Sequence, residues 1–393
     1  MTLAQKWKAA PFWSLYKRGK KTGFPTEELL SVYRDYGVIK KSDRDDNWNR
    51  PGEDLSAYQL VDAGDLVLNK MKTWQGSLGV SQHRGIVSPA YFVYKPQSQN
   101  DSRFMHYALR SDHYIKVYAS ISKGVRPNQW DLQPEQLDAM HVLVPDLTTQ
   151  QRIADYLDRE VGEIDDMMAK MDELAGQLEE RRDAVILREL QDIPGRAQLT
   201  LTVDVISGSG FPDKYQGAST NELPFYKVGS MSSAVNGYLG EDENSVSRST
   251  AAELGARVIP PGSILMAKIG AALMLARFVQ TTKSACIDNN MQALVPRDGV
   301  VDPRFLAYAM TEVSIPSLVK NGPVPTVDVM GMKMTHIACP STLDEQKRIA
   351  DHLNDVTGKI DAMLAKVAEL KSLLTERRAA LITDVVTGRK ELA

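Results

Sequence analysis

The stretch QRIADYL at residues 151–157 returns as KRIADHL at residues 347–353, an offset of 348 − 152 = 196 residues. Continued without a gap, residues 152–186 match residues 348–382 at 19 of 35 positions. Self-similarity at a fixed period is the first feature to seek in a chain, because it decides the architecture. Since the chain has 393 residues, about twice this offset, we interpret it as a tandem duplication.

Fainter matches link the segments upstream of the repeated stretches. They comprise Gly64–Met71 with Gly262–Ile269, Arg103-Phe104 and Tyr107 with Arg304-Phe305 and Tyr308, Gly124 and Pro127 with Gly322 and Pro325, and strand-like runs ending at Pro145 and Pro340. The strongly related segments are expected to do the same job twice. The weakly related segments are expected to do two different jobs.

The repeated stretches read as long helices with a narrow apolar stripe. The stripe steps by 4, 3, 3 and 4 residues in both copies, through Ile164, Met168, Met171, Leu174 and Leu178 and through Ile360, Leu364, Val367, Leu370 and Leu374. Such a stripe is typical of a coiled coil or a helical hairpin. About 40 residues at ~1.5 Å each give a rod of about 60 Å.

The residues that flank the two helices indicate where each helix begins and ends. Thr148 or Thr149 is expected to cap the first helix and Thr342 or Asp344 the second, and Pro194-Gly195 closes the first. Each helix must bury its stripe, and the simplest partner is the other helix in an antiparallel coiled coil. A parallel pairing, or pairing with another protein, remains an alternative at this point.

The chain is therefore predicted to be an α+β protein with a pseudo-two-fold repeat of four segments. Two globular α/β domains, residues 1–148 and 194–341, alternate with two helical segments, residues 149–193 and 342–393. Strands are expected at the β-branched and aromatic runs 60–61, 66–68 and 91–94, which turn residues separate. Each globular segment is long enough for a core of its own.

The composition is that of an ordinary globular chain, with 43% hydrophobic and 25% charged residues. No apolar run approaches a membrane span, and the first residues lack the pattern of a secretory signal. With only two cysteines, Cys286 and Cys339, a disulfide framework is not expected, and a cytoplasmic location is.

The net charge of −3 is unevenly distributed along the chain. Residues 1–149 carry 20 basic and 16 acidic residues, hence +4, and include the basic run Lys17-Arg18-Gly19-Lys20-Lys21. Residues 150–191 carry 6 against 12, hence −6, whereas residues 192–343 and 344–393 sum to −1 and 0. An acidic first helix favours a protein partner over a phosphate backbone.

Motifs of catalytic chemistry are missing from the sequence. There is no G-x4-G-K-[ST] phosphate loop, no Asn/Asp-Pro-Pro-aromatic motif of amino-methyltransferases and no G-x-S-x-G elbow. Ile259-Pro260-Pro261-Gly262 has neither the polar residue before nor the aromatic after the prolines, and the six histidines do not cluster. We therefore expect a binding protein without a catalytic centre, a metal or a cofactor of its own.

Two segments of the form P-x(4–6)-Q-[QK]-R-I-A-x-x-L…I-D, residues 145–165 and 340–361, each follow a divergent domain, and the tail Val385–Lys390 ends the chain's second helix. This layout closely resembles the specificity subunit of type I restriction–modification systems. The resemblance covers the entire chain. Its helical motifs are fairly specific, whereas the globular segments match the family only by their placement.

The resemblance implies a function for each segment. Each globular segment would be a target-recognition domain that reads one half of a bipartite double-stranded DNA sequence, and the two helices, conserved in that family, would form an antiparallel coiled coil that sets the spacer. The chain would bind two copies of a modification subunit, which uses S-adenosylmethionine to methylate adenine. Restriction subunits, using ATP and Mg²⁺, would complete the assembly, and no cofactor would reside in this chain.

Polar and basic loop residues are the candidates for base contacts, because Arg suits guanine, and Asn or Gln suits adenine. The candidates in the first domain are Lys70, Lys72, Trp74, Gln75, His83, Arg84, Ser122, Lys123, Arg126, Asn128 and Gln129. Those in the second are Ser230, Ser232, Ser233, Lys268, Asn289, Asn290, Gln292 and Asn321. For each, a solvated loop position is an equal alternative, and for Trp74 a place in the core is the stronger one.

The helices supply candidates for packing between helices or subunits. These are Ile164, Met168, Leu178, Ile360, Leu364 and Leu374. Arg181-Arg182 and Arg377-Arg378 would contact a partner or the DNA spacer, or pair with neighbouring acids.

Two other classes of function compete with a DNA-specificity subunit. One is a protein–protein scaffold with two binding heads on a coiled-coil spacer, and the other is a self-sufficient methyltransferase or nuclease. A footprint of two short patches around a sequence-indifferent gap would favour the specificity subunit over the scaffold. Modification or cleavage of DNA by the purified chain alone would establish the enzyme.

Overall fold

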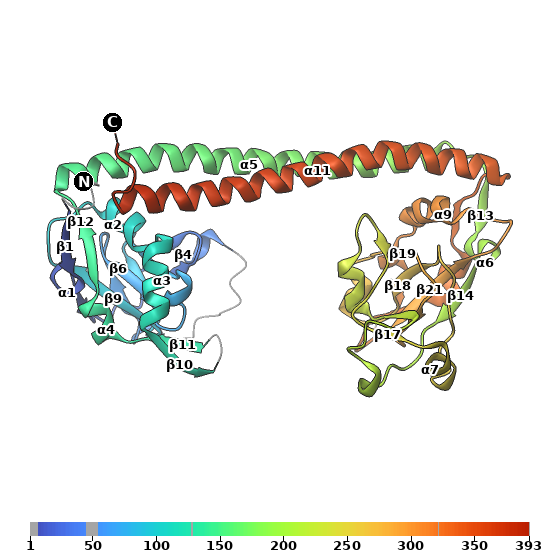
Figure 1. Ribbon diagram of the computed structural model, residues 1–393, viewed down its shortest axis with the longest axis horizontal. Helices are drawn as coiled ribbons and strands as arrows, with labels where there is room; N and C mark the ends of the chain where they lie inside the picture. Colours follow the sequence, from blue (N-terminus) through green and yellow to red (C-terminus); the bar gives the residue numbers. More distant parts are fainter. Residues whose placement is uncertain (1–6, 45–53, 127–128, 321, 393) are drawn as a thin grey trace. The chain divides into compact units, whose positions relative to one another are not determined.

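The computed structural model describes residues 7–44, 54–126, 129–320 and 322–392, without the side chains of residues 125, 126 and 129. The chain forms two compact units (Figure 1). Unit 1 comprises Met1–Asp172 and Glu369–Ala393, and unit 2 comprises Glu173–Ala368. Each unit contains a globular head and a segment of both long helices. Within the described ranges, no helix is both long and apolar enough for a membrane span.

The first head, residues 7–144, is built on a four-stranded antiparallel sheet. Its order is β2-β9-β6-β7, with β2 Tyr16–Gly19, β9 Tyr91–Pro96, β6 Leu66–Asn69 and β7 Leu78–Val80. Smaller pairs are β1 Lys8–Pro11 with β12 His141–Val144, β3 Leu30–Tyr33 with β4 Gly37–Lys40, β5 Gln59–Val61 with β8 Gly85–Val87, and β10 Ser122–Arg126 with β11 Gln129–Leu132. The helices are α1 Phe12–Leu15, α2 Ser102–Leu109, α3 Asp112–Ile121 and α4 Pro134–Ala139. The predicted strands at 60–61, 66–68 and 91–94 are thus confirmed as parts of β5, β6 and β9.

The second head, residues 196–338, is built on a five-stranded sheet. Its order is β14-β21-β18-β19-β16, with β14 Val203–Ser207, β21 Met291–Pro296, β18 Ile264–Ala267, β19 Val279–Thr281 and β16 Tyr238–Leu239. The remaining strands are β17 Ser245–Val246, β15 Leu223–Tyr226 and β20 Cys286–Ile287 in one sheet, β13 Arg196–Gln198 with β24 His336–Ala338, and β22 Val319–Lys320 with β23 Thr326–Val327. The helices are α6 Leu199–Thr202, α7 Arg248–Glu253, α8 Ala271–Met274, α9 Pro303–Ala309 and α10 Val329–Met334.

The two heads repeat one topology despite their faint sequence similarity. The order β2-β9-β6-β7 of the first head returns as β14-β21-β18-β19 in the second, and β16 is an addition. Registers agree as well, since β6 pairs with β9 as β18 pairs with β21. The same order of small elements follows, a helix after the last sheet strand (α2, α9), a hairpin (β10–β11, β22–β23) and a strand (β12, β24). The faint matches of Gly64–Met71 with Gly262–Ile269, and of Arg103 and Tyr107 with Arg304 and Tyr308, therefore lie at equivalent positions of one fold.

The long helices are α5 Leu147–Gln191, of 45 residues, and α11 Leu343–Val386, of 44 residues. The Thr342 hydroxyl accepts the Glu345 backbone N–H (3.3 Å), so the predicted cap of the second helix is confirmed. The predicted cap of the first helix is wrong. The carboxylate of Asp146 accepts the backbone N–H of Thr149 (3.0 Å), because the helix begins at Leu147, two to three residues earlier than the threonines suggested.

The first glutamine of each repeated motif joins the helix to its head. Gln150 is 2% exposed, accepts the backbone N–H of Asp101 (2.9 Å) and donates to the Pro145 carbonyl (2.9 Å). Gln346, 1% exposed, accepts the backbone N–H of Asp302 (2.7 Å) and donates to the Pro340 carbonyl (3.0 Å) in the same way.

The aspartates that donate their backbone N–H groups at these joints are also the caps of the head helices. Asp101 caps α2 and Asp302 caps α9, each accepting two backbone N–H groups. Two residues after each of these aspartates, Arg103 pairs with Asp155 (2.9 Å) and Arg304 with Asp351 (2.5 Å) on the long helix. The motif is therefore repeated because it builds the same helix-to-head joint twice.

Within unit 1, the segments of α5 and α11 run in opposite directions. Arg378 donates from Nε to Asp165 (2.9 Å), and Lys371 pairs with Asp172. Within unit 2, Arg182 pairs with Asp361 (3.0 Å) and Glu189 with His352 (3.7 Å), so the two helices are antiparallel there as well.

The apolar stripe of these helices differs from the predicted one at a single repeated position. Ile164 and Leu178 are buried, but Leu174 and its repeat equivalent Leu370 are 45% and 46% exposed. The half-buried neighbour Ala175 takes the place of Leu174 in the stripe. The expectation was wrong because a seam of 3.5 residues per turn alternates steps of 4 and 3, whereas the leucines require two successive steps of 3.

Candidate nucleic-acid interface

A lysine at the end of the central strand occupies the same place in both heads. Lys70 follows β6 and Lys268 follows β18. The backbone N–H of each lysine donates to the loop before the neighbouring strand, to Ala90 (3.3 Å) and Asn290 (2.9 Å). Each lysine carbonyl accepts an N–H from the nearby hairpin, that of Leu132 (3.1 Å) or Val327 (3.0 Å). The sheet thus fixes the start of one loop and one hairpin in each head.

The two lysines open the β6 loop (residues 70–77) and the β18 loop (residues 268–277). Both loops turn back through a left-handed residue, Gly76 with φ +93° and Ala276 with φ +48°. A left-handed alanine costs of order 1 kcal/mol, so the surrounding structure imposes this turn.

The tips of the two loops present different side chains. In the β6 loop, Trp74 and Gln75 precede the turn and are half-buried. In the β18 loop, the equivalent residues are Met274 and Leu275, which are 49% and 69% exposed. Equivalent loops therefore carry an aromatic and an amide side chain at the tip in one head and two apolar side chains in the other.

Aromatic rings and cations surround the β6 loop. Trp74 packs on Trp130 of β11, with 4.8 Å between ring centroids, and donates from Nε1 to the Met71 carbonyl (2.9 Å). The Lys70 ammonium and the Arg18 guanidinium lie 4.9 and 4.2 Å from the centroid of Phe92. Cations interleaved with aromatic faces suit nucleic-acid backbones and bases.

The other residues predicted for the first head divide by accessibility. Lys72 and Lys123 are exposed, whereas Ser122 has a buried hydroxyl oxygen without a hydrogen-bond partner among the described residues. Arg126 and Gln129 lie on β10 and β11, and their side chains are outside the described part. Asn128 lies outside the described residues.

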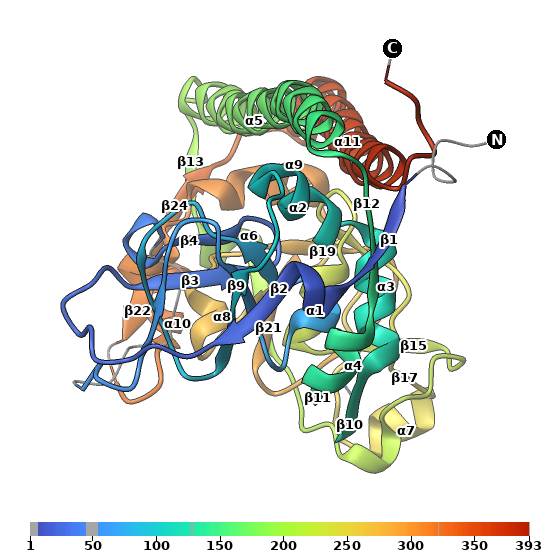
Figure 2. The ribbon, with the colours of Figure 1, turned by 90° about the vertical axis from the view of Figure 1, so that its left-hand side faces the viewer.

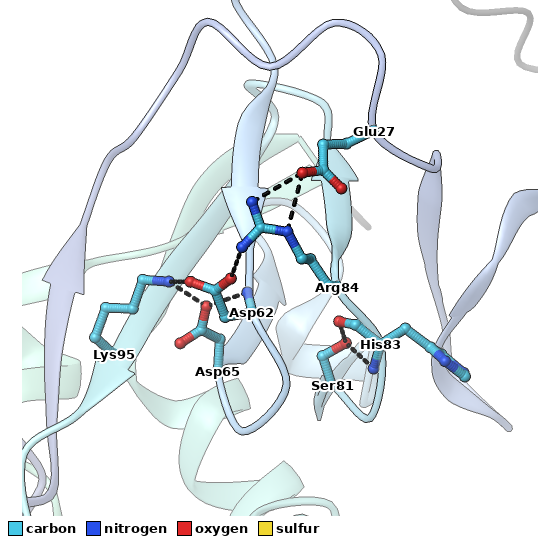
Figure 3. Close-up of polar contacts among 7 residues, drawn as sticks. All are labelled: Glu27, Asp62, Asp65, Ser81, His83, Arg84 and Lys95. Carbon is cyan, nitrogen blue, oxygen red and sulfur yellow. Dashed lines mark hydrogen bonds and ion pairs between the residues drawn. The ribbon is translucent and has the colours of Figure 1, made fainter.

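Arg84 belongs to an ion-pair network away from the β6 loop, and His83 precedes Arg84 in the chain (Figure 3). Arg84 pairs with Glu27 (2.8 Å) and Asp62 (2.6 Å), while the ring of His83 points away from the network. The charge of Arg84 is therefore neutralised by acids of the same head.

Lys95 closes this network from strand β9. It pairs with Asp62 (2.9 Å) and Asp65 (2.5 Å). The hydrogen bond from Lys95 lowers the pKa of Asp62, whereas burial raises the pKa of Asp65. One acid is therefore stabilised as an anion by its partner, and the other is penalised by desolvation.

The serines predicted for the second head bond to their own turn. They lie on one 3-10 segment, Val228–Ser233, beside the β18 loop, where Arg277 donates to the Met231 carbonyl (3.4 Å). Ser232 and Ser233 donate to backbone carbonyls three residues earlier, and Ser230 accepts the Lys227 N–H (3.0 Å).

The amides predicted for the second head are not equally accessible. Asn289 is exposed and Asn290 half-buried in the loop before β21. Gln292 is 1% exposed, and its Oε1 has no hydrogen-bond partner among the described residues. Asn321 lies outside the described residues.

Five residues beside these loops were not among the sequence-based candidates. They are Arg18, Phe92 and Trp130 in the first head, and Met274 and Leu275 in the second. Arg18 belongs to a basic run that the sequence displays, but its distance of 52 residues from Lys70 conceals that both flank one ring. Met274 and Leu275 read as core residues in an apolar stretch. An alignment of the two loops on Gly76 and Ala276 would have found them.

Two curated proteins are similar in sequence to this chain, although no family model matches it. The type I restriction enzyme StySPI specificity subunit of Salmonella potsdam is 20% identical over 236 residues, 56% of this chain and 50% of that protein. The type I restriction enzyme EcoKI specificity subunit of Escherichia coli (strain K12) is 23% identical over 177 residues, 44% of this chain and 38% of that protein. The chain thus spans half or less of the length of the curated relatives it matches.

A solved structure of a type I R-M system, which concerns its complex assembly and conformational transition, contains a chain with the same fold. The TM-score is 0.72 at 15% identity, and the match covers 97% of both chains. The resemblance to the specificity subunits of type I restriction–modification systems, which the repeated motifs indicated, is therefore confirmed by the curated relatives, and this structure shows that a chain of a type I R-M system has the same fold.

Proposed function

We propose that this chain is the sequence-specific DNA-recognition subunit of a type I restriction–modification system, and that each head reads one half of a bipartite target. The observation that carries the proposal is the lysine-led loop, which the same backbone hydrogen bonds fix in both heads and which ends in different tips. The similarity to specificity subunits supports it.

The chemistry of the two tips supports two unlike half-sites. Lys70 and Lys268 supply phosphate contacts that position each head without carrying sequence information. Gln75 offers an amide to base edges, whereas Met274 and Leu275 offer apolar contact of the kind that favours a thymine methyl group. An asymmetric target follows from one topology with two loop tips.

The long helices are proposed to set the spacer as an antiparallel coiled coil. At ~1.5 Å per residue, the 45 residues of α5 span about 67 Å, nearly two turns of duplex at ~34 Å each. The packing residues are proposed to be Ile164, Met168, Leu178, Ile360, Leu364 and Leu374, all of which are buried or half-buried. We also propose that the chain is divided by function into two target-recognition domains, residues 1–148 and 194–341, and two helical segments, residues 149–193 and 342–393.

The helices are also proposed to dock two copies of a modification subunit. Met167 and its repeat equivalent Met363 are 48% and 54% exposed, and Leu174 and Leu370 form a second such pair. Exposed apolar side chains at repeated positions offer two identical subunits the same surface twice.

The modification subunits would carry the S-adenosylmethionine chemistry, and restriction subunits, where present, the ATP- and Mg²⁺-dependent cleavage. In this proposal the chain itself is non-catalytic and works in the cytoplasm.

Methylation mapping of DNA modified by this chain with its modification subunit tests the proposal. We expect two short half-sites separated by a fixed gap of unread bases. Inserting a few helical residues after Gly176 in α5 and the matching number in α11 should change the gap and leave both half-sites intact. Altered half-sites, or methylation without sequence preference, would contradict the proposal.

A further inference from the structure

Strand β2 carries a run of cations at the edge of the first head's sheet. β2 bonds only to β9, so its other side has no strand partner in this sheet (Figure 2 shows β2 and β9). Lys17, Arg18 and Lys20, here called the cationic edge, are exposed. Within the described part of the chain, none of the three forms an ion pair with an acid closer than 4 Å.

Two other cations around this sheet are balanced by acids. Lys95 and Arg84 are held by Asp62, Asp65 and Glu27 (Figure 3). Lys21 lies close enough to this network to lower the pKa of Asp62. Lys17 and Lys20 of the cationic edge therefore carry charge without an ion-paired acid among the described residues, whereas the charge of Arg18 acts on Asp138, opposing the rise that burial causes in the pKa of that carboxyl. All three lie in the segment that carries the +4 excess.

The cationic edge is continuous with the β6 loop. The guanidinium of Arg18 and the ammonium of Lys70 lie over the same Phe92 ring. The loop then continues to Lys72, which is exposed. A positively charged surface thus runs from the edge strand into the loop proposed to read bases.

The second head lacks this surface at the equivalent strand, β14. Val205 lies opposite Leu294 as Arg18 lies opposite Tyr94, so a valine replaces the arginine. Ser207 stands where Lys20 stands, and the neighbouring Asp204 pairs with Arg297 (2.9 Å). The two heads therefore share the fold of this strand, but the second head lacks the cations of the first.

We propose that the cationic edge binds phosphates of duplex DNA beside the first half-site, so that the first head supplies a sequence-independent electrostatic contact that β14 does not. The inference rests on the proposed function, because it assigns the phosphate contacts of one head. Lysines on an edge strand also discourage pairing with other chains. If the lysines served only to prevent such pairing between chains, the proposal would be wrong.

The test compares the full chain with its Lys17→Gln/Arg18→Gln/Lys20→Gln variant, using fluorescence anisotropy of labelled duplexes in about 50 to about 200 mM KCl. Each phosphate contact contributes about 0.9 to the slope of log affinity against log salt. We expect the slope to fall in magnitude by about 2 to 3, with equal loss of affinity on the mapped target and on a scrambled duplex. Lys8→Gln, at an exposed lysine on β1, should leave the slope unchanged.

An unchanged slope in the triple variant would overturn the proposal, and self-association of that variant by light scattering would then assign the edge a protective role. Unequal losses on the two duplexes would overturn it in favour of base reading. The charge-retaining Lys17→Arg/Lys20→Arg variant should keep the slope, and tryptophan fluorescence should confirm folding of both. Failure of the proposed function is distinguishable, because wild type would then not prefer the mapped target whatever its salt slope.

Discussion

Arg378 donates from Nε to the carboxylate of Asp165 at 2.9 Å, and this contact has an equivalent in unit 2, where Arg182 pairs with Asp361 at 3.0 Å. Adding the repeat offset of 196 converts Arg182 into Arg378 and Asp165 into Asp361. One interaction therefore occurs once in each unit. Two copies of one helix that pair in opposite directions meet through the same residues twice, so duplication alone supplies a self-consistent register.

This ion pair predicts a small but measurable coupling in unit 1. Both side chains are partly exposed, so a double-mutant cycle of Arg378→Ala and Asp165→Ala should give about 0.2–1 kcal/mol in the free energy of unfolding. Urea denaturation followed by tryptophan fluorescence measures it. Arg377→Ala, one residue away and exposed, should show no coupling to Asp165→Ala, and equal coupling of both arginines would contradict the register.

The buried glutamine of the helix-to-head joint predicts a much larger difference between neighbours. Gln150→Ala should lower the stability of unit 1 by about 1–3 kcal/mol, because it leaves the buried N–H of Asp101 without an acceptor. Gln151→Ala changes an exposed side chain of the same type and should cost less than about 0.5 kcal/mol. Similar losses in the two variants would show that the joint does not depend on Gln150.

Unit 1 should lose stability in mild acid through His106. Its Nδ1 lies 3.3 Å from the Val80 carbonyl and its Nε2 accepts from Arg110 (2.7 Å), which requires a neutral ring. Burial, and then the charge of Arg110, lower the pKa of His106 to about 3, against about 6.5 in the unfolded chain. Between these values the unfolded state binds the extra proton. The stabilisation is therefore complete above about pH 6.5 and falls by up to about 1.4 kcal/mol per pH unit below it.

Urea denaturation at several pH values tests this dependence, with tryptophan fluorescence as the probe. All five tryptophans lie in the sequence of unit 1, so the signal reports that unit. His106→Gln should flatten the decline below pH 6.5, whereas His141→Gln, at an exposed histidine of the same head, should leave it unchanged. An identical decline in wild type and His106→Gln would refute the assignment.

The two loop tips predict independent changes of the two half-sites. Trp74→Ala should weaken or relax recognition of one half-site, by roughly 1–3 kcal/mol, and leave the other intact. Leu275→Ala should do the converse, because it occupies the equivalent tip in the second head. Methylation mapping of both variants measures this. A change in the same half-site for both would show that the tips do not divide the target between them.

The helices were predictable because their signals are local and repeated. The narrow stripe through Ile164 and Leu178 identified the helices, and the motif ending at Leu157 identified the duplication. Only the structure showed that the glutamine of this motif forms the joint to the head. The errors concerned spacing within one turn. Leu174 and Leu370 lie beside the seam, and Asp146 caps α5 two to three residues before the expected threonines.

The sequence by itself determined that the chain is a duplication with two unlike globular segments and two like helices. A repeat period and an apolar stripe can be recognised from the order of residues along the chain alone. Only the tertiary structure decided which charges are free. Arg84 and Arg18 are both arginines of one basic segment, but Glu27 and Asp62 neutralise the first, whereas the second lies over Phe92 beside Lys70. These partners lie 22 to 74 positions away in the chain, and only folding brings them within the few ångströms over which charges pair.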